Sequence, residues 1–301
     1  MRSILGLLFE LLILPAFGKF MAGALEVISG SVTGPGATLT AWTVNAGNSL
    51  AVRSAPLTSN VWLLEKWAYN DTAAGVLRIR SPRLHDNVQG IRTRVTNNDT
   101  EPLLSGLASW GWRQKLVPQD ILIAEQSGSA ANIDSGHLLL YYENLPGISA
   151  RFIDNATLIA NGVNRIGQEV SVTTTAASAA YTGQVAINVT NDNFKANTDY
   201  ALLGAMVDTR VGCVRIQGAD VGNLGIGIPG EPSQRHLMSN YFQRLSDIYG
   251  VPLIPVFNSA NKTAILVDAT GHTAAVTAVI TFYMVELAAK TGGSSGGQYG
   301  V

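Results

Sequence analysis

Few residues of this chain have the spacing that metal or nucleophilic chemistry requires. No two of the four histidines, His85, His137, His236 and His272, lie within ten residues of each other, so neither a His-x-His nor a His-x-x-x-His pair exists. The single cysteine, Cys213, excludes an intrachain disulfide framework and any cysteine-cluster zinc or iron–sulfur site. Because the neighbours of Cys213 are apolar, we expect a buried and unreactive thiol.

Two glycine patterns match functional loops. Residues 225–230 fit the Gly-x-Gly-x-x-Gly pattern of dinucleotide-binding loops, but that fold also needs an acidic residue about 20 positions later at a strand end. The only acidic residue there, Asp247, falls inside an expected helix. Residues 292–296 fit Gly-x-Ser-x-Gly, yet they lie in a Gly/Ser-rich tail rather than between a strand and a helix. We therefore expect no bound cofactor.

Oxygen ligands are the remaining source of chemistry. Asn191, Asp192, Asn193 and Asp199 could bind calcium, but their spacing fits no known calcium loop, and such clusters usually form turns. A glycosidase needs two carboxyl groups about 5–10 Å apart, a distance that sequence does not give. The candidate carboxylates are Asp71, Glu125, Asp134, Glu143, Asp208 and Asp268. We expect no metal site and no catalytic residues.

The composition favours a surface that is covered by neighbouring protein. The chain has 301 residues, enough for two domains, and 47% of them are hydrophobic, but only 14% are charged and the net charge is −1. This balance excludes a basic protein that coats nucleic acid and an acidic disordered tail. Only six of the 20 basic residues are lysines, and lysine is the residue depleted where surfaces become interfaces.

The N-terminus carries an apolar run over residues 4–14, which Pro15 ends. The run is shorter than the roughly 20 residues that a spanning helix needs. Glu10 also interrupts it, which disfavours a signal peptide without excluding one. We expect a short, retained apolar helix that contacts lipid or a neighbouring subunit. Its membrane-contact candidates are Leu7, Leu8, Phe9, Leu11 and Leu12.

From about residue 31, short runs rich in β-branched residues alternate with turn residues. The expected strands include residues 75–80, 120–124, 137–142, 170–174, 184–189 and 275–285. Strands do not alternate regularly with long helices, so a parallel α/β sheet is disfavoured. Two helices are expected, a weaker one after Glu101-Pro102 and a stronger one from Glu231-Pro232 to a stop at Gly250.

An internal repeat organises these elements. Residues 72–79 and 209–216 share the pattern Thr-x-x-Gly-x-x-Arg-Ile, and the same order of apolar runs, Glu-Pro helix and late strands surrounds each copy. We read a duplicated β-rich domain, with Gly75 equivalent to Gly212. The expected core positions are Leu77, Ile79, Val214 and Ile216. Arg78 and Arg215 should point away from the cores and are our interface candidates, because a guanidinium pairs across an interface at lower desolvation cost than an ammonium.

This organisation resembles that of the double jelly-roll major capsid proteins of tailless icosahedral viruses with an internal membrane, bacteriophages among them. The resemblance covers about residues 35–290. It implies an all-β fold of two tandem eight-stranded antiparallel jelly-roll sandwiches, each with a short helix inserted, after an N-terminal apolar helix. The implied division is a membrane-proximal segment at 1–30, jelly rolls at 31–148 and 149–290, and a flexible tail at 291–301.

The same resemblance implies a structural subunit that is not an enzyme. Three chains would form a pseudo-hexagonal capsomer, and capsomers would build an icosahedral shell over a lipid membrane. The implied partners are other copies of the chain, penton or vertex proteins, and the membrane through the N-terminus, with no direct contact to nucleic acid. The protein would reside in the virion after assembly in the host cytoplasm.

Two alternatives stay open. Some amide-cleaving glycosidases consist of two jelly rolls and would use acidic residues between them. A carbohydrate-binding or adhesive module would use exposed aromatic side chains. The tryptophans available for it are Trp42, Trp62, Trp67, Trp110 and Trp112, which we expect to be core, interface or helix residues instead.

Overall fold

The computed structural model describes residues 23–45, 49–53, 60–70, 72–84, 86–95, 114–143, 145, 147–148, 150–175, 180–231, 238–272 and 275–288. The N-terminal membrane-contact candidates, the first expected helix and the tail lie outside the described residues. Residues Ala22–Ala288 belong to one compact unit. Within the described ranges, no helix has the length and apolar character needed to cross a membrane.

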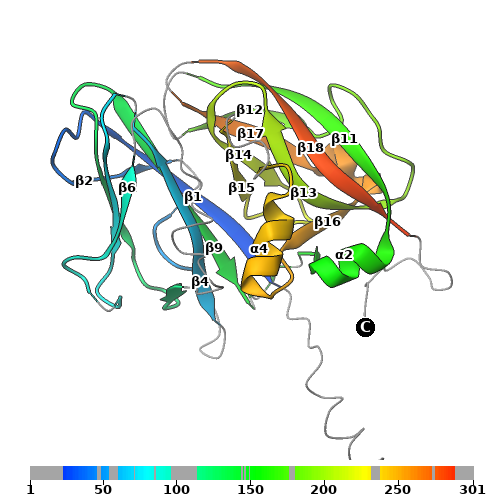
Figure 1. The fold of residues 1–301 in the computed structure, drawn as a ribbon, viewed down its shortest axis with the longest axis horizontal. Coiled ribbons are helices and arrows are strands. Elements are labelled where there is room, and N and C mark those ends of the chain that lie inside the picture. Colours follow the sequence, from blue (N-terminus) through cyan, green and yellow to red (C-terminus); the bar gives the residue numbers. More distant parts are fainter. Residues whose placement is uncertain are drawn as a thin grey trace, which may run out of the picture. The chain divides into compact units, whose positions relative to one another are not determined.

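The first half of this unit, from β1 to β9, consists of two antiparallel sheets (Figure 1). One sheet has the order β3-β1-β9-β4-β7 and the other β2-β8-β5-β6. Their side chains share one apolar core, which includes Ile28, Leu77, Ile79 and Leu140. The strands are β1 (Ala24–Thr33), β2 (Thr40–Ala41), β3 (Thr43–Val44), β4 (Val61–Tyr69), β5 (Gly75–Arg80), β6 (Ile91–Val95), β7 (Gln114–Leu116), β8 (Ile123–Ser127) and β9 (Ile133–Tyr142).

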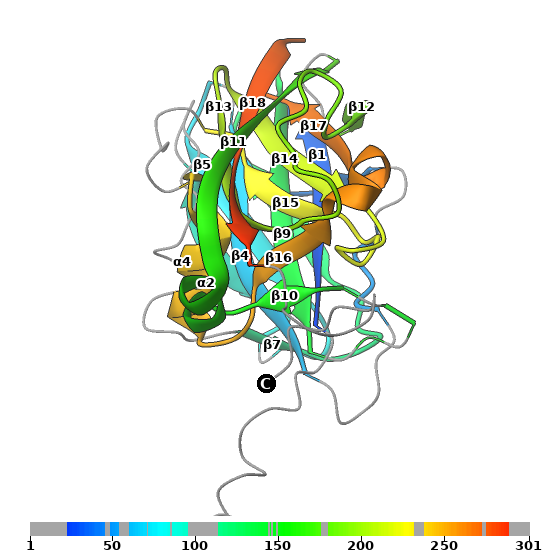
Figure 2. The same ribbon diagram turned by 90° about the vertical axis from the view of Figure 1, so that its right-hand side faces the viewer.

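The second half, from β10 to β18, also has two antiparallel sheets, β10-β16-β13-β18-β11 and β12-β17-β14-β15. Figure 2 shows β11 and β18 side by side at the front of the first of these sheets. The strands are β10 (Phe152–Ile153), β11 (Gly162–Thr173), β12 (Tyr181–Ala186), β13 (Asp199–Val207), β14 (Val211–Gln217), β15 (Ile226–Pro229), β16 (Ile254–Asn258), β17 (Leu266–Gly271) and β18 (Thr277–Leu287). The helices are α2 (Asn155–Asn161), α4 (Tyr241–Tyr249) and the 3-10 helix η4 (Ser259–Ala264).

The two halves share one strand order, and the all-β prediction is confirmed. Leaving out β3 and β10, which have no counterpart in the other half, eight strands remain in each half. Numbered from 1 to 8 along the chain, they give sheets 1-8-3-6 and 2-7-4-5 in both halves. The third strand carries a bulge at the same place in each half, between Leu63 and Glu65 in β4 and between Leu202 and Gly204 in β13. The chain therefore contains a structural duplication.

The repeated sequence motif lies on equivalent strands, as the sequence predicts. Residues 75–79 belong to β5 and residues 212–216 to β14, the fourth strand of each half. The four expected core residues are buried, whereas Arg78 and Arg215 alternate with them and point to the outer side of their sheets. In both halves this Arg pairs in register with a carboxylate residue of the seventh strand, Glu125 or Asp268.

One boundary and one additional helix differ from the sequence expectation. The N-terminal segment was assigned to residues 1–30, but β1 begins at Ala24 and lies between β3 and β9 within its sheet. The signal was hidden because β1 is buried on both faces and so lacks polar alternation. The start of the helix expected from Glu231 lies outside the described residues, whereas α4 begins at Tyr241 and the expected stop at Gly250 is confirmed by a left-handed φ of 63°. The helix α2, which was not expected, begins where the Asp154 side chain accepts a hydrogen bond from the Thr157 backbone N–H.

The duplication predicts equal sensitivity at equivalent core positions. Ile79→Ala and Ile216→Ala should each lower the free energy of unfolding by about 2–5 kcal/mol, because each removes a fully buried aliphatic group. Ile159→Ala is the matched control, since Ile159 lies on α2 and is 73% exposed. Urea unfolding followed by circular dichroism measures all three. A cost at Ile216 no larger than that at Ile159 would contradict the core assignment.

Candidate functional site

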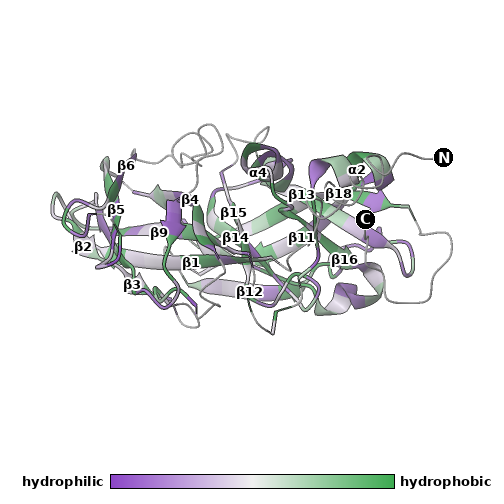
Figure 3. Cartoon of the chain, turned by 90° about the horizontal axis from the view of Figure 1, so that it is seen from below, coloured by the Kyte–Doolittle hydropathy of each residue, from purple (hydrophilic) through white to green (hydrophobic). Residues whose placement is uncertain are grey.

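The halves meet face to face along a surface that we call the seam. The outer side of the β1-β9-β4 sheet packs on the outer side of the β12-β17-β14-β15 sheet, and Figure 3 shows β14 and β15 in pale green beside β1 and β9. The Val27 backbone N–H donates to the Gly225 carbonyl at 2.8 Å, and the Trp67 indole donates to the Gly212 carbonyl at 3.1 Å. Side chains of the seam include Val27, Ser29, Trp67 and His137 from the first half, and Tyr181, Cys213 and Arg215 from the second.

The helix α4 closes one end of the seam. Figure 1 shows α4 next to β4, and the Tyr249 hydroxyl donates to the Leu64 carbonyl at 2.6 Å. Gly204 on β13 allows this arrangement, because a Cβ there would lie 2.0 Å from the Met238 carbonyl oxygen just before the helix. The helix thus packs on its own half while it binds the other.

A hydrogen-bonded chain of three side chains crosses the seam. The Ser29 Oγ lies 2.6 Å from both His137 Nδ1 and the Tyr181 hydroxyl oxygen, and the Trp67 ring stacks on the imidazole with 5.2 Å between ring centroids. A Ser–His pair is the core of many hydrolases. Here Ser29 and His137 have no exposed surface, and His137 Nε2 has no hydrogen-bond partner among the described residues. These hydrogen bonds therefore join the two halves, and the buried Ser29 does not present a nucleophile.

The seam keeps its histidines neutral. Burial lowers the pKa of His137 to about 3, and burial together with the Arg210 charge lowers the pKa of His272 to about 3. The Tyr69 ring packs edge-on against both imidazoles. A proton on either ring would be a buried charge.

Arg215 makes the main ion pair of the seam. Its Nε and Nη2 atoms lie 2.9 and 2.6 Å from the two carboxylate oxygens of Asp268, and the guanidinium carbon lies 3.7 Å from the centre of the Tyr181 ring. The side chains of Arg215 and Asp268 are only 13% and 4% exposed. This interface candidate therefore faces the other half of its own chain.

Arg78 occupies the equivalent position in the first half, on a sheet whose outer side no other sheet of the described residues covers, and its side chain is 16% exposed. Its Nε lies 2.6 Å from Glu125 Oε2, and Arg80 Nε lies 3.0 Å from the same oxygen. Although burial acts in the opposite direction, hydrogen bonds from Arg80 and Arg78 lower the pKa of Glu125. Arg92 and Arg94 stand exposed on the neighbouring strand β6, opposite Arg78 and Val76. We call the outer side of β8, β5 and β6, with Arg78, Arg80, Arg92, Arg94 and Glu125, the arginine face.

The other candidate carboxylates of the sequence are dispersed and bonded locally. Asp134 accepts a hydrogen bond from the Ser129 backbone N–H, and Asp208 accepts one from the Val279 backbone N–H. Glu143 accepts from the side chains of Asn60 and Trp62, and Asp71 lies outside the described residues. No two of these carboxylates are brought together by a contact described for the chain.

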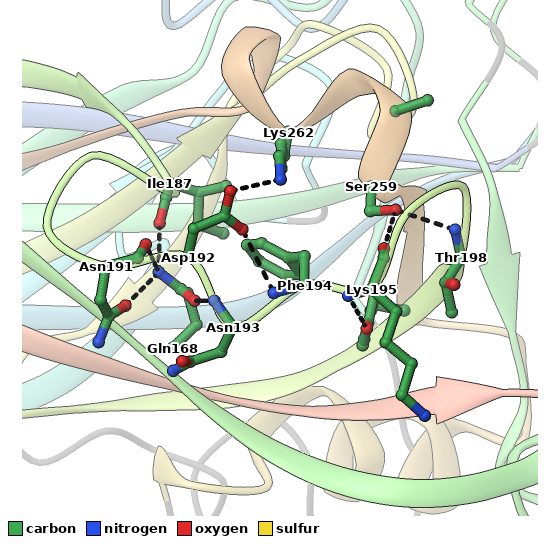
Figure 4. A network of polar contacts seen from close by, with 12 residues as sticks. Gln168, Ile187, Asn191, Asp192, Asn193, Phe194, Lys195, Thr198, Ser259 and Lys262 are labelled. Carbon is green, nitrogen blue, oxygen red and sulfur yellow. Dashed lines mark hydrogen bonds and ion pairs between the residues drawn. The ribbon is translucent and has the colours of Figure 1, made fainter.

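Of the calcium candidates, the two aspartates pair with basic side chains and the two asparagines are bonded to Gln168. Figure 4 shows Asp192 in contact with Lys262, and Gln168 donating to the Asn191 side chain and backbone. Asp199 pairs with Arg151. Within the described ranges, no group of three or more His, Cys, Asp or Glu side chains could hold a metal ion.

The remaining candidates from the sequence lie in strands or are buried where the structure describes them. Residues 226–229 of the glycine pattern form strand β15 itself, so they offer no phosphate-binding loop. Cys213 is buried in the seam as expected, and burial is the main cause that raises its pKa to about 12. Trp42 and Trp67 are buried and Trp62 is partly buried, whereas the other two tryptophans lie outside the described residues.

Sequence reasoning missed most of the seam. Ser29 is 108 residues from His137 and 152 residues from Tyr181 along the chain, and no local sequence pattern links them. One signal was available, since Glu65 interrupts the apolar run 61–69 and is buried opposite Leu139 on the seam side of its sheet. Lys66 is also buried, but it lies opposite the core residue Leu138 and faces the interior of the first half. Burial raises the pKa of Glu65 well above its ordinary value and lowers the pKa of Lys66 to about 8.

No family model and no curated protein matches the sequence. Among solved structures, the PBSX exported protein XepA is 10% identical, with 88% of this chain and 87% of that chain covered and a TM-score of 0.24. The infectious bursal disease virus VP2 subviral particle is 12% identical, with 98% of this chain and 75% of that chain covered and a TM-score of 0.13. Likenesses this low carry no function to this chain, so its function is argued from its own geometry.

Removing Arg215 should cost more stability than removing Arg78. Arg215→Met leaves Asp268 buried without its partner and should destabilise the fold by about 3–5 kcal/mol, whereas Arg78→Met leaves Glu125 with Arg80 and should cost about 1 kcal/mol or less. Adding Asp268→Leu to Arg215→Met should restore much of the loss. Urea unfolding measures each variant. Equal costs at the two arginines would contradict the idea that Arg80 compensates for the loss of Arg78 at Glu125.

Acid should weaken the seam. The folded pKa of His137 and of His272 lies near 3, below the ordinary value of 6.5, so the unfolded chain binds more protons between these pH values. Each histidine should therefore lower the free energy of unfolding by up to about 1.4 kcal/mol per pH unit as the pH falls from 6.5 towards 3. Unfolding at several pH values should show a smaller slope for His137→Gln. An unchanged slope would show that His137 is not held neutral.

Proposed function

We propose that this protein is a structural subunit that assembles with copies of itself, built as a tandem double jelly roll. The order 1-8-3-6 and 2-7-4-5 of eight antiparallel strands in two sheets, found in each half, supports the jelly-roll assignment. The position of α4 between β15 and β16 supports the expected helix inserted before the late strands. The proposal includes no catalytic activity.

One observation carries this proposal, namely that the seam joins two different sheet faces. The first half contributes its 1-8-3-6 sheet and the second half its 2-7-4-5 sheet. Among the described residues, the complementary pair stays uncovered by another sheet: it is the arginine face of the first half and, beside the strand β13 on which α4 packs, the outer side of β11 and β18 in the second. Contacts between unlike faces are head-to-tail contacts, and these close into rings when the rotation fits. Three chains supply six similar halves, which suits a closed trimer.

The larger assembly follows from the capsid resemblance together with the low charge of the chain. A shell of pseudo-hexagonal trimers over a lipid bilayer needs extensive contacts between subunits and little charge, and 14% charged residues suit it. In this proposal the N-terminal apolar segment contacts the membrane and vertex proteins fill the five-fold positions. The protein is then a virion component that is assembled in the host cytoplasm and separated from the genome by the bilayer.

The purified full-length protein should be a trimer. Light scattering after size exclusion should give three times the chain mass of 31.8 kDa at micromolar concentration, because the two unlike faces of every chain are all covered only when the chains form a closed ring. Electron microscopy of the same sample should show three-fold particles with a pseudo-hexagonal outline. A strict monomer at these concentrations would contradict the proposal.

A further inference from the structure

The duplication allows the contacts of the seam to be mapped onto the arginine face and the outer side of β11 and β18, the two faces that no other sheet covers in the described part of the chain. Val27 of β1 is paired with Leu139 of β9, and Gly167 of β11 is paired with Tyr283 of β18. Counted from the bulges that β4 and β13 share, Leu139 and Tyr283 occupy the same position. Gly167 is therefore the second-half equivalent of Val27.

The opposite side of the seam maps in the same way. Gly227 is paired with Arg215 across β15 and β14, and Arg92 is paired with Arg78 across β6 and β5. Because Arg78 and Arg215 are equivalent, Arg92 is the first-half equivalent of Gly227. The positive φ angles of Gly90 and Gly225, two residues earlier in each half, agree with this register.

The seam pair Val27 and Gly227 and its equivalent pair Gly167 and Arg92 both combine a large residue with a glycine. The glycine lies on opposite sides of the contact in the two pairs. In the seam, the large Val27 packs on Gly227, where an added Cβ would lie 2.6 Å from Val27 Cγ2. On the arginine face the large residue is Arg92, and on the outer side of β11 and β18 the small one is Gly167. Gly167 is exposed, and a Cβ there would meet only the Thr281 methyl group at 3.6 Å, so the fold of this chain does not require glycine at this position. A strand glycine without such a need often marks the close approach of another chain.

A carboxylate lies within reach of the proposed pairing. Glu169 lies two residues beyond Gly167 on β11 and is exposed on the same side, about 7 Å along the strand, while Arg165 is exposed two residues before Gly167. The arginine face carries four arginines and one carboxylate. An Arg92 side chain that lies over Gly167 can therefore reach a carboxylate at Glu169.

We propose that Arg92 of one copy lies over Gly167 of a second copy and pairs with its Glu169, so that the arginine face docks on the outer side of β11 and β18. The occupant of the arginine face is thus a second copy of this chain. This inference rests on the proposed self-assembly and adds the residues that align the copies. It predicts that association depends on the charge at positions 92 and 169 and on the absence of a side chain at position 167.

Charge reversal tests the pair. Arg92→Glu and Glu169→Arg should each raise the dissociation constant of the trimer at least about tenfold, and the double variant should recover most of that loss because the pair is restored with opposite sense. Lys115→Glu is the matched control, since it makes the same charge change on the other sheet of the first half and should leave association unchanged. Sedimentation over a concentration series measures all of these full-length proteins.

Gly167→Val tests shape without changing charge. Valine suits a strand, and the site has room for it in the isolated chain, so thermal stability at a concentration that gives monomers should stay near wild type. Association should fall at least about tenfold, because the valine occupies the space assigned to Arg92.

The outcomes separate the two proposals. A monomeric wild type would overturn self-assembly and this inference with it. A trimeric wild type that is insensitive to both charge reversals and to Gly167→Val would overturn the inference while leaving self-assembly standing. Weakening by each single change, with recovery in the double charge reversal, supports both.

Discussion

The close approach of two sheets at Gly212 and Gly227 is the contact on which the rest of this structure depends. A Cβ at Gly227 would collide with Val27, and one at Gly212 would lie 2.4 Å from the Thr270 hydroxyl and 3.1 Å from His137 Nε2. These two glycines bring the backbones near enough for Trp67 to donate to the Gly212 carbonyl. Because the β1-β9-β4 sheet is then covered on both sides, Ala22–Ala288 forms one compact unit in spite of its duplication.

The seam is held together by polar contacts as well as by apolar packing. Its polar side chains face one another, with Ser29 between His137 and Tyr181 and with Arg215 against Asp268. Neutral imidazoles and one well-bonded ion pair fix the register of two faces without leaving a net buried charge. The arginine face bears the equivalent ion pair, but it has no covering half within the described part of the chain.

Sequence predicted what is local and repeated. The strand at Gly75–Arg80, the outward position of Arg78 and the helix stop at Gly250 follow from alternation and turn chemistry, and the shared motif led to the duplication. It failed where both sides of a strand are buried, as at Ala24–Thr33, and where partners come from distant strands, as with Ser29 and Tyr181. The seam could not be predicted because it depends on which sheet faces meet, and no local pattern records that choice.

The central claim, that copies meet as the two halves do, is tested most directly by a disulfide between Arg92→Cys and Gly167→Cys in one chain. At the equivalent seam positions, a Cβ on Gly227 would lie 2.7 Å from Val27 Cβ, so a small shift reaches the roughly 3.8 Å of a disulfide. Under mild oxidation, a non-reducing gel should show covalent trimers for the double variant and single chains for each single-cysteine variant. A double variant that is trimeric in solution but runs only as single chains on the gel would contradict the account.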